Sequence, residues 1–163
     1  MKKLFLMRHA KSSWKDETLD DFERPLNTRG ERDVLTMAQR LKNRDIMPEL
    51  IVSSAAKRAK KTAKKLAKTL EYDKKKILFL KELYESDESF IMKLLQGMDD
   101  RVETLLIIGH NPEFNIVAEE LVGFDENIVT SGVVEIVFDV EQWNEVGAEN
   151  ARLISYDYPK NEK

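Results

Sequence analysis

The sequence contains no cysteine and two histidines, and none of its apolar runs approaches the roughly 20 residues that a membrane-spanning helix needs. Without cysteine there is no disulfide framework, no thiolate metal site and no cysteine nucleophile. Two histidines give little support to a metal-dependent hydrolase, and the Gly-x-Ser-x-Gly turn of many serine hydrolases is absent. We therefore expect no metal and no cofactor.

The remaining composition is that of a globular protein. Hydrophobic residues make up 42% and charged residues 35% of the 163 positions, and the net charge is −3. A chain of this length is most simply one domain, so we expect a single domain spanning residues 1–163, monomeric and cytoplasmic. The negative net charge argues against a nucleic-acid partner, and the short apolar runs argue against a membrane partner.

Short apolar runs alternate with segments of helical periodicity along the chain. A capping-box pattern from Thr28 to Glu31 predicts the start of the first helix, and Ser53 and Ser54 are suited to cap the second. We expect helices at about 28–41, 55–70, 89–96 and 112–121. We expect strands at 3–7, 50–52, 77–80, 104–108, 133–138 and 152–156. This alternation predicts a three-layer α/β/α sandwich with a mostly parallel central sheet and one antiparallel strand.

The two histidines come just after two of these strands, His9 after 3–7 and His110 after 104–108. Because ligands bind beyond the carboxyl ends of parallel strands, we expect both imidazoles at one site. An imidazole with an ordinary pKa of about 6.5 is largely neutral near pH 7 and can attack phosphorus. The guanidinium of Arg8 suits phosphoryl oxygens. We therefore expect His9 to be the nucleophile and His110 to donate a hydrogen bond to a phosphoryl oxygen.

Two further charged groups extend this hypothesis. Arg58 lies at the boundary between the apolar and lysine-rich faces of the second helix, so it can point toward the sheet edge. A general acid would come from the end of the third strand, where we prefer Glu82 over Glu85. We read the lysines of the second helix as a solvated face, with docking of an acidic protein as the alternative. The competing interpretation gives all of these residues structural roles only.

Four pieces of the chain, in order, resemble the histidine phosphatase superfamily, also called phosphoglycerate mutase-like, and in particular its small SixA-type phosphohistidine phosphatases. These pieces are residues 6–10, 23–30, 54–59 with Thr62, and 109–112. The resemblance spans nearly the whole chain. It departs from the common pattern at Ala10, where many relatives have glycine, and at Ala55, where many have proline.

The resemblance implies His9 as the nucleophile, a phosphate pocket made by Arg8, Arg58 and His110, and no metal. Further contacts with the substrate are expected from Ser12, Ser13, Arg24, Asn111 and Asn115. For Arg24 we favour a structural pairing with Asp21, and a contact with the phosphate is the other reading. Whether the loop 11–27 acts as a lid stays open.

We predict a cofactor-independent phosphatase that forms a phosphohistidine at His9 and acts on phosphohistidine in a protein. The alternatives are a phosphatase of a small phosphorylated metabolite and a non-catalytic module that only binds phosphate. A mutase is disfavoured because long insertions normally enclose such a site. A two-component receiver domain is disfavoured because the first strand ends in Arg8 and His9 rather than in acids.

Overall fold

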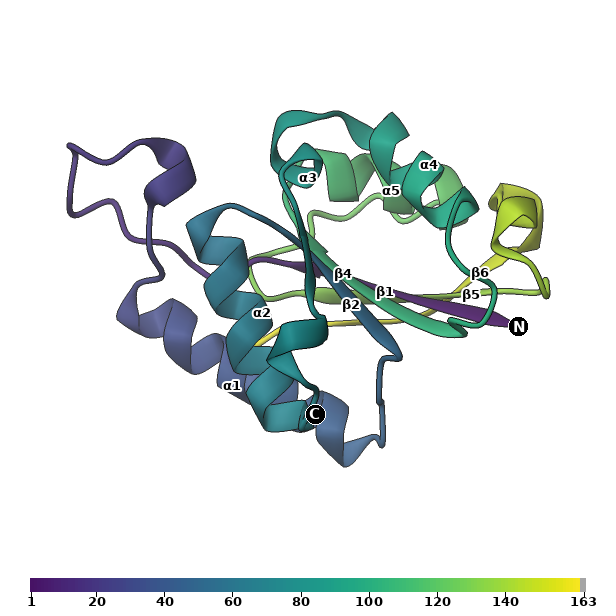
Figure 1. The fold of residues 1–163 in the computed structure, drawn as a ribbon, viewed down its shortest axis with the longest axis horizontal. Coiled ribbons are helices and arrows are strands. Elements are labelled where there is room, and N and C mark those ends of the chain that lie inside the picture. Colours follow the sequence, from purple (N-terminus) through teal and green to yellow (C-terminus); the bar gives the residue numbers. More distant parts are fainter. Residues whose placement is uncertain (162–163) are drawn as a thin grey trace.

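A six-stranded sheet forms the centre of the computed structural model, which describes residues 1–161 (Figure 1). The last two residues of the expected domain therefore lie outside the described part. The strand order is β3-β2-β4-β1-β5-β6. The strands are β1 (Lys2–Arg8), β2 (Leu50–Ser54), β3 (Leu78–Leu80), β4 (Thr104–Gly109), β5 (Val133–Phe138) and β6 (Ala151–Asp157).

The direction of the strands confirms the expected mostly parallel sheet. β1 pairs in parallel with β4, β4 with β2, and β2 with β3. β5 pairs antiparallel with both β1 and β6, so β5 alone runs against the other five strands. The expectation of one reversed strand is thus confirmed.

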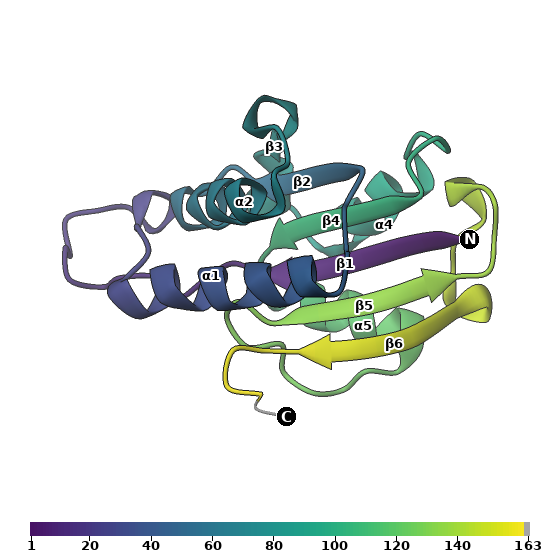
Figure 2. The ribbon, with the colours of Figure 1, turned by 90° about the horizontal axis from the view of Figure 1, so that it is seen from below.

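Helices cover both faces of the sheet, as the alternating pattern predicted. Figure 2 shows α1 (Thr28–Asn43) and α2 (Lys57–Leu70) on one face, and α4 (Glu88–Gln96) and α5 (Glu113–Val122) on the other. Along β1 the side chains alternate between the two cores, because successive residues of a strand point to opposite faces. Leu4 and Leu6 join the α4 and α5 side, whereas Phe5 and Met7 join the α1 and α2 side.

Short helical segments complete the chain. They are α3 (Glu82–Glu85) and the 3-10 helices η1 (Asp21–Glu23), η2 (Lys74–Lys76), η3 (Trp143–Glu145) and η4 (Ala148–Asn150). Within residues 1–161, none of the helices combines the length and the apolar character that crossing a membrane requires.

The two predicted helix caps were wrong in detail. Asn27, not Thr28, caps α1, since its side-chain oxygen accepts the Gly30 N–H at 2.7 Å. Ser54 ends β2, and α2 begins only at Lys57 after an Ala56 cap with no side-chain hydrogen bond. At α1 a residue outside the expected motif thus satisfies a free amide of the first turn, and this is what a cap must do.

The parallel pairing of β1 with β4 brings the two histidines together. Arg8 lies opposite Gly109 in this register, so the residue that follows each strand faces the same sheet edge. The His9 N–H donates to the Gly109 carbonyl at 3.0 Å and extends the pairing by one step. The long segment between β1 and α1 projects beyond this edge (Figures 1 and 2).

Candidate active site

His9 is buried just after β1 and lines the pocket. Its Nδ1 lies 2.8 Å from the carbonyl oxygen of Ala10. Because a carbonyl only accepts, Nδ1 carries the hydrogen and Nε2 keeps its lone pair. The Arg58 Nε–H donates toward Nε2 at 3.4 Å. This is the tautomer that a nucleophilic imidazole needs.

The surroundings of His9 keep its ring uncharged. The pKa of His9 is lowered from its ordinary 6.5 to about 3, mainly by burial; the nearby His110, Arg58 and Arg8 also lower it, while the hydrogen bond to Ala10 acts to raise it. Each of these causes disfavours a second positive charge in a space that already holds guanidinium groups. The nucleophile is therefore unprotonated at any pH near neutrality.

His110 follows β4 and lies beside His9, with 5.0 Å between the ring centroids. Its Nε2 is 2.8 Å from the hydroxyl oxygen of Ser54, at the end of β2. Burial lowers the pKa of His110 to about 4, and Arg58 contributes to that shift. The ring of Tyr84 packs edge-on against His110 at 5.5 Å.

The two predicted arginines lie on either side of the histidines. Arg8 donates from Nη1 to the carbonyl of Ile128 at 3.0 Å, while its buried Nε has no hydrogen-bond partner among the described residues. Arg58 is 6% exposed, so it points inward from α2 as its place at the edge of the helix's apolar face predicted. An unpartnered guanidinium N–H next to a nucleophile is suited to a phosphoryl oxygen.

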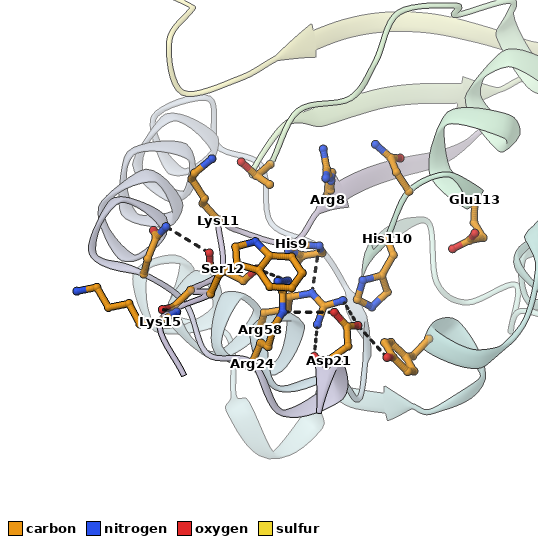
Figure 3. Close-up of a pocket in the computed structure, with 16 residues that line it drawn as sticks. Arg8, His9, Lys11, Ser12, Lys15, Asp21, Arg24, Arg58, His110 and Glu113 are labelled. Carbon is orange, nitrogen blue, oxygen red and sulfur yellow. Dashed lines mark hydrogen bonds and ion pairs between the residues drawn. The ribbon is translucent and has the colours of Figure 1, made fainter. Parts of the chain in front are cut away.

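The carboxylate of Asp21 binds the positively charged arginines of the pocket (Figure 3). Arg58 donates to the Asp21 carbonyl at 2.7 Å and to its carboxylate at 3.0 Å. Tyr84 donates its hydroxyl to the same carboxylate at 2.8 Å, and Arg24 Nε lies 3.3 Å from the other carboxylate oxygen. These partners hold the pKa of Asp21 below its usual range, although partial burial acts to raise it.

Arg24 forms the predicted pair with Asp21 and also lies in the wall of the cavity. There its Nη2 donates to the Ser12 hydroxyl. Its guanidinium stacks 3.3 Å above the exposed ring of Trp14. Its buried Nε and Nη1 have no hydrogen-bond partner within residues 1–161.

The base of the loop 11–27 is tied together by main-chain hydrogen bonds. The Ser13 N–H donates to Pro25 at 2.8 Å, and the Asn27 N–H donates to Lys11 at 3.0 Å. Asn111 ties a second loop, because its side chain donates to the Ile128 carbonyl at 2.8 Å. That carbonyl also accepts from Arg8, so Asn111 shares a structural contact with the phosphate pocket.

These side chains enclose a cavity of about 640 Å³ at the sheet edge. Most of the predicted residues line it: Arg8, His9, Ser12, Ser13, Arg24, Arg58, His110 and Asn111. Asn115 lies one helical turn further on and accepts the Ile128 N–H, so it supports the wall rather than lining it. Within residues 1–161, no group of three or more His, Asp or Glu side chains is placed to hold a metal ion.

The expected general acid is not brought to this cavity. Glu82 and Glu85 are both exposed on α3 and do not line it. The two carboxylates that do line it, Asp21 and Glu113, were not predicted as acids. Glu113 is the first residue of α5, only three positions after His110, and its place just after β4 was the signal available in the sequence.

Glu113 and Asp21 differ in their surroundings. Burial raises the pKa of Glu113, and the neighbouring carboxylates Glu88 and Asp87 raise it further. Asp21 is bound by two arginines and stays ionised. Two carboxyl groups whose pKa values are pushed apart in one pocket are suited to different roles.

Comparison with known families agrees with this geometry. The chain matches the family model of the histidine phosphatase superfamily (branch 1) over residues 4–111 of its 163. The chain belongs to the histidine phosphatase superfamily. As a histidine phosphatase it is an enzyme of the hydrolase class, and the matched region contains β1, the loop 11–27, α2 and both histidines.

Solved structures share the fold over nearly the whole chain. The candidate phosphohistidine phosphatase SixA of Agrobacterium tumefaciens superimposes with a TM-score of 0.83 at 25% identity, covering 97% of this chain and 98% of that one. A protein histidine phosphatase SixA complexed with tungstate gives 0.82 at 24% identity, covering 96% of this histidine phosphatase and 97% of that chain. The fold is therefore the phosphoglycerate mutase-like sandwich that the sequence predicted.

Curated relatives at similar identity have no stated function. An uncharacterised chloroplastic protein of Arabidopsis thaliana is 28% identical over 155 residues, which cover 90% of this histidine phosphatase and 71% of the relative. An uncharacterised protein of Mycobacterium leprae is 27% identical, with coverage of 94% and 100%.

Proposed function

We propose that this histidine phosphatase works without a cofactor, through a phosphohistidine intermediate at His9, and that its substrate is a phosphohistidine carried by a protein. The observation that carries the proposal is the unprotonated Nε2 of His9, fixed by the Ala10 carbonyl between Arg8, Arg58 and His110. The likeness to SixA proteins supports the choice of substrate.

In the first step, the lone pair of His9 Nε2 forms a bond to phosphorus, and the bond between phosphorus and the leaving nitrogen breaks. The electron pair of that bond stays on the leaving imidazole, which takes a proton from the pocket. Arg8, Arg58 and His110 stabilise the charge on the phosphoryl oxygens, which is the main task of a protein in phosphoryl transfer. A phosphoryl group that enters displaces the Asp21 carboxylate from Arg58.

In the second step, water attacks phosphorus, and the electron pair of the N–P bond returns to Nε2. The intermediate is a phosphorylated ring that still carries its Nδ1 hydrogen and is therefore positively charged. The environment that lowers the pKa of His9 to about 3 also disfavours that charged ring. The same burial thus favours loss of the phosphoryl group to water.

We assign the proton of the leaving group to Glu113 rather than to Glu82. Glu113 lines the cavity on the His110 side (Figure 3), and its raised pKa keeps more of it protonated than an ordinary glutamate. After the first step its carboxylate can take a proton from the attacking water, which restores the starting state. Glu82 is exposed and outside the cavity.

The test is to trap the phosphoenzyme. Wild type and His9→Ala protein are incubated, in chelator, with p-nitrophenyl phosphate and with a phosphohistidine-bearing protein, and acid-labile label is located by mass spectrometry. We expect turnover and label on His9 in the wild type and neither in His9→Ala. Faster turnover of the aryl phosphate than of the phosphoprotein would favour a small-molecule substrate. No turnover and no label, with phosphate still bound, would leave a binding module.

A further inference from the structure

A second groove lies beside the catalytic cavity, and it is basic. It encloses about 290 Å³ and is lined by Phe22, Glu23, Ala55, Lys57, Lys60, Lys61 and Lys64. The four lysines come from two successive turns of α2, and this helix contains no acidic residue from Lys57 to Leu70. We refer to Phe22 and these four lysines as the basic groove.

The lysines of the basic groove form no ion pair among residues 1–161, although the carboxylate of Glu23 also lines the groove. Among residues 1–161, none of the four has a carboxylate oxygen within 4.0 Å, whereas Lys65, one position further along the helix, pairs with Glu31 at 3.9 Å. Lys57, Lys61 and Lys64 are exposed. Unopposed like charges on one face of a helix repel one another and lower the stability of the helix. The lysines are gathered on this face although the net charge of the whole chain is −3.

The basic groove adjoins the catalytic cavity through neighbouring residues, although the two have no lining residue in common. Phe22 packs edge-on against Tyr84 with 4.9 Å between the ring centroids, and Tyr84 lines the cavity. Asp21, next to Phe22, binds Arg58, and Arg58 follows Lys57 on α2. A molecule whose phosphoryl group reaches His9 therefore has the basic groove directly alongside it.

We infer that the basic groove docks an acidic segment of the phosphorylated protein whose phosphohistidine enters the catalytic cavity. This inference rests on the proposed function and narrows it from a phosphohistidine protein to one with acidic residues beside the modified histidine. A small metabolite is held by the cavity alone and has no use for a second groove. Acidic side chains complement the lysines, and the ring of Phe22 offers an apolar contact at the centre.

The test compares two phosphohistidine peptides that differ only in their flanking residues, Asp and Glu in one and Asn and Gln in the other. A few exposed ion pairs are together worth roughly tenfold, so we expect kcat/KM to favour the acidic peptide about tenfold at low salt. The preference should shrink toward equality near 0.5 M salt, where the screening length is about 4 Å.

The variant Lys57→Glu/Lys61→Glu/Lys64→Glu should remove or reverse the preference. The control Lys75→Glu/Lys93→Glu/Lys160→Glu makes the same change in charge at exposed lysines outside the groove and should keep it. The ratio between the two peptides is the readout, and p-nitrophenyl phosphate turnover reports separately on the catalytic cavity.

The other outcomes are distinct. Equal rates on both peptides in the wild type, or an unchanged preference in the groove variant, would overturn the docking proposal while leaving the phosphatase intact. Equal loss of the preference in groove and control variants would show an effect of net charge alone and would also overturn it. Absence of turnover on every substrate in the wild type would instead count against the proposed function.

Discussion

Lowering the pH from about 7 to about 5 should destabilise this protein strongly, because two imidazoles are held neutral inside it. His9 and His110 are each 7% exposed, and burial lowers their pKa values from 6.5 to about 3 and about 4. The unfolded chain binds a proton at each imidazole below its ordinary pKa, while the folded chain does not. The free energy of unfolding therefore falls as the pH drops below about 6.5, and it keeps falling until the folded pKa values are reached.

The magnitude follows from these pKa values. At pH 5, protonation of one imidazole stabilises the unfolded state by about 2 kcal/mol relative to pH 7. The folded state gains almost nothing at pH 5, since both of its pKa values lie lower. Two histidines therefore remove about 4 kcal/mol, which is a large part of a typical total of about 5–15 kcal/mol.

Urea denaturation at the two pH values measures this change directly. It should be done in phosphate-free buffer, because an anion bound at the cavity would itself stabilise the folded state. The double variant His9→Asn/His110→Asn has no imidazole to titrate, so its pH-dependent loss should fall below about 1 kcal/mol. If wild type and variant lose the same free energy between the two pH values, the histidines are not buried as neutral rings and the reasoning is refuted.

Three further changes test other parts of the site. Glu113→Gln should slow the hydrolysis of phenyl phosphate by roughly 100-fold and barely affect that of p-nitrophenyl phosphate, because a good leaving group needs little protonation. An equal loss of rate on both substrates would indicate a structural role for Glu113. Asp21→Asn should tighten tungstate binding, measured by calorimetry, by roughly twofold to fivefold, since the half-exposed carboxylate no longer competes for Arg58; weaker binding would contradict this. Gly30→Ala places a Cβ 2.1 Å from the Lys11 carbonyl oxygen and should cost roughly 1–3 kcal/mol or more, seen in thermal unfolding; an unchanged midpoint would show that the loop yields freely.

The centre of the site could be predicted because it depends on strand ends. An apolar run that stops at a charged residue indicates where a buried strand leaves the sheet, and parallel pairing then aligns the ends of neighbouring strands. His9 and His110 meet for this reason alone. Arg58 was also predictable, since its angular position on α2 places it between the buried and solvated faces.

The loop between β1 and α1 could not be predicted in the same way. It has no periodicity, and its conformation depends on contacts with residues far along the chain. Asp21 binds Arg58, 37 positions away, and Tyr84, 63 positions away. The pairing of Asp21 with Arg24 was foreseeable because they are three residues apart, but the long-range pairs that decide the loop's place were not.

The start of α1 near Thr28 was predicted correctly, but its capping residue was not. The motif from Thr28 to Glu31 satisfies the spacing of a capping box, yet the Asn27 side chain already bonds the Gly30 N–H. The two candidate caps lie one residue apart, and Gly30, in the first turn, packs closely against the main chain of Lys11. That packing is a tertiary contact, which local spacing does not reveal.

The proposed general acid is Glu113 rather than a residue of α3, because the segment after β3 is short. α3 contains only four residues, and its two glutamates face solvent. The next strand along the chain, β4, supplies what that segment does not, because the chain turns after His110 directly into α5 and Glu113 lies in its first turn. A carboxylate there would normally be stabilised in its ionised form by the amides of the helix start. Burial and the carboxylates Asp87 and Glu88 act in the opposite direction and raise its pKa. The pocket thus combines an ionised Asp21, which an entering phosphoryl group displaces from Arg58, with a more readily protonated Glu113, which can supply the proton that a poor leaving group needs.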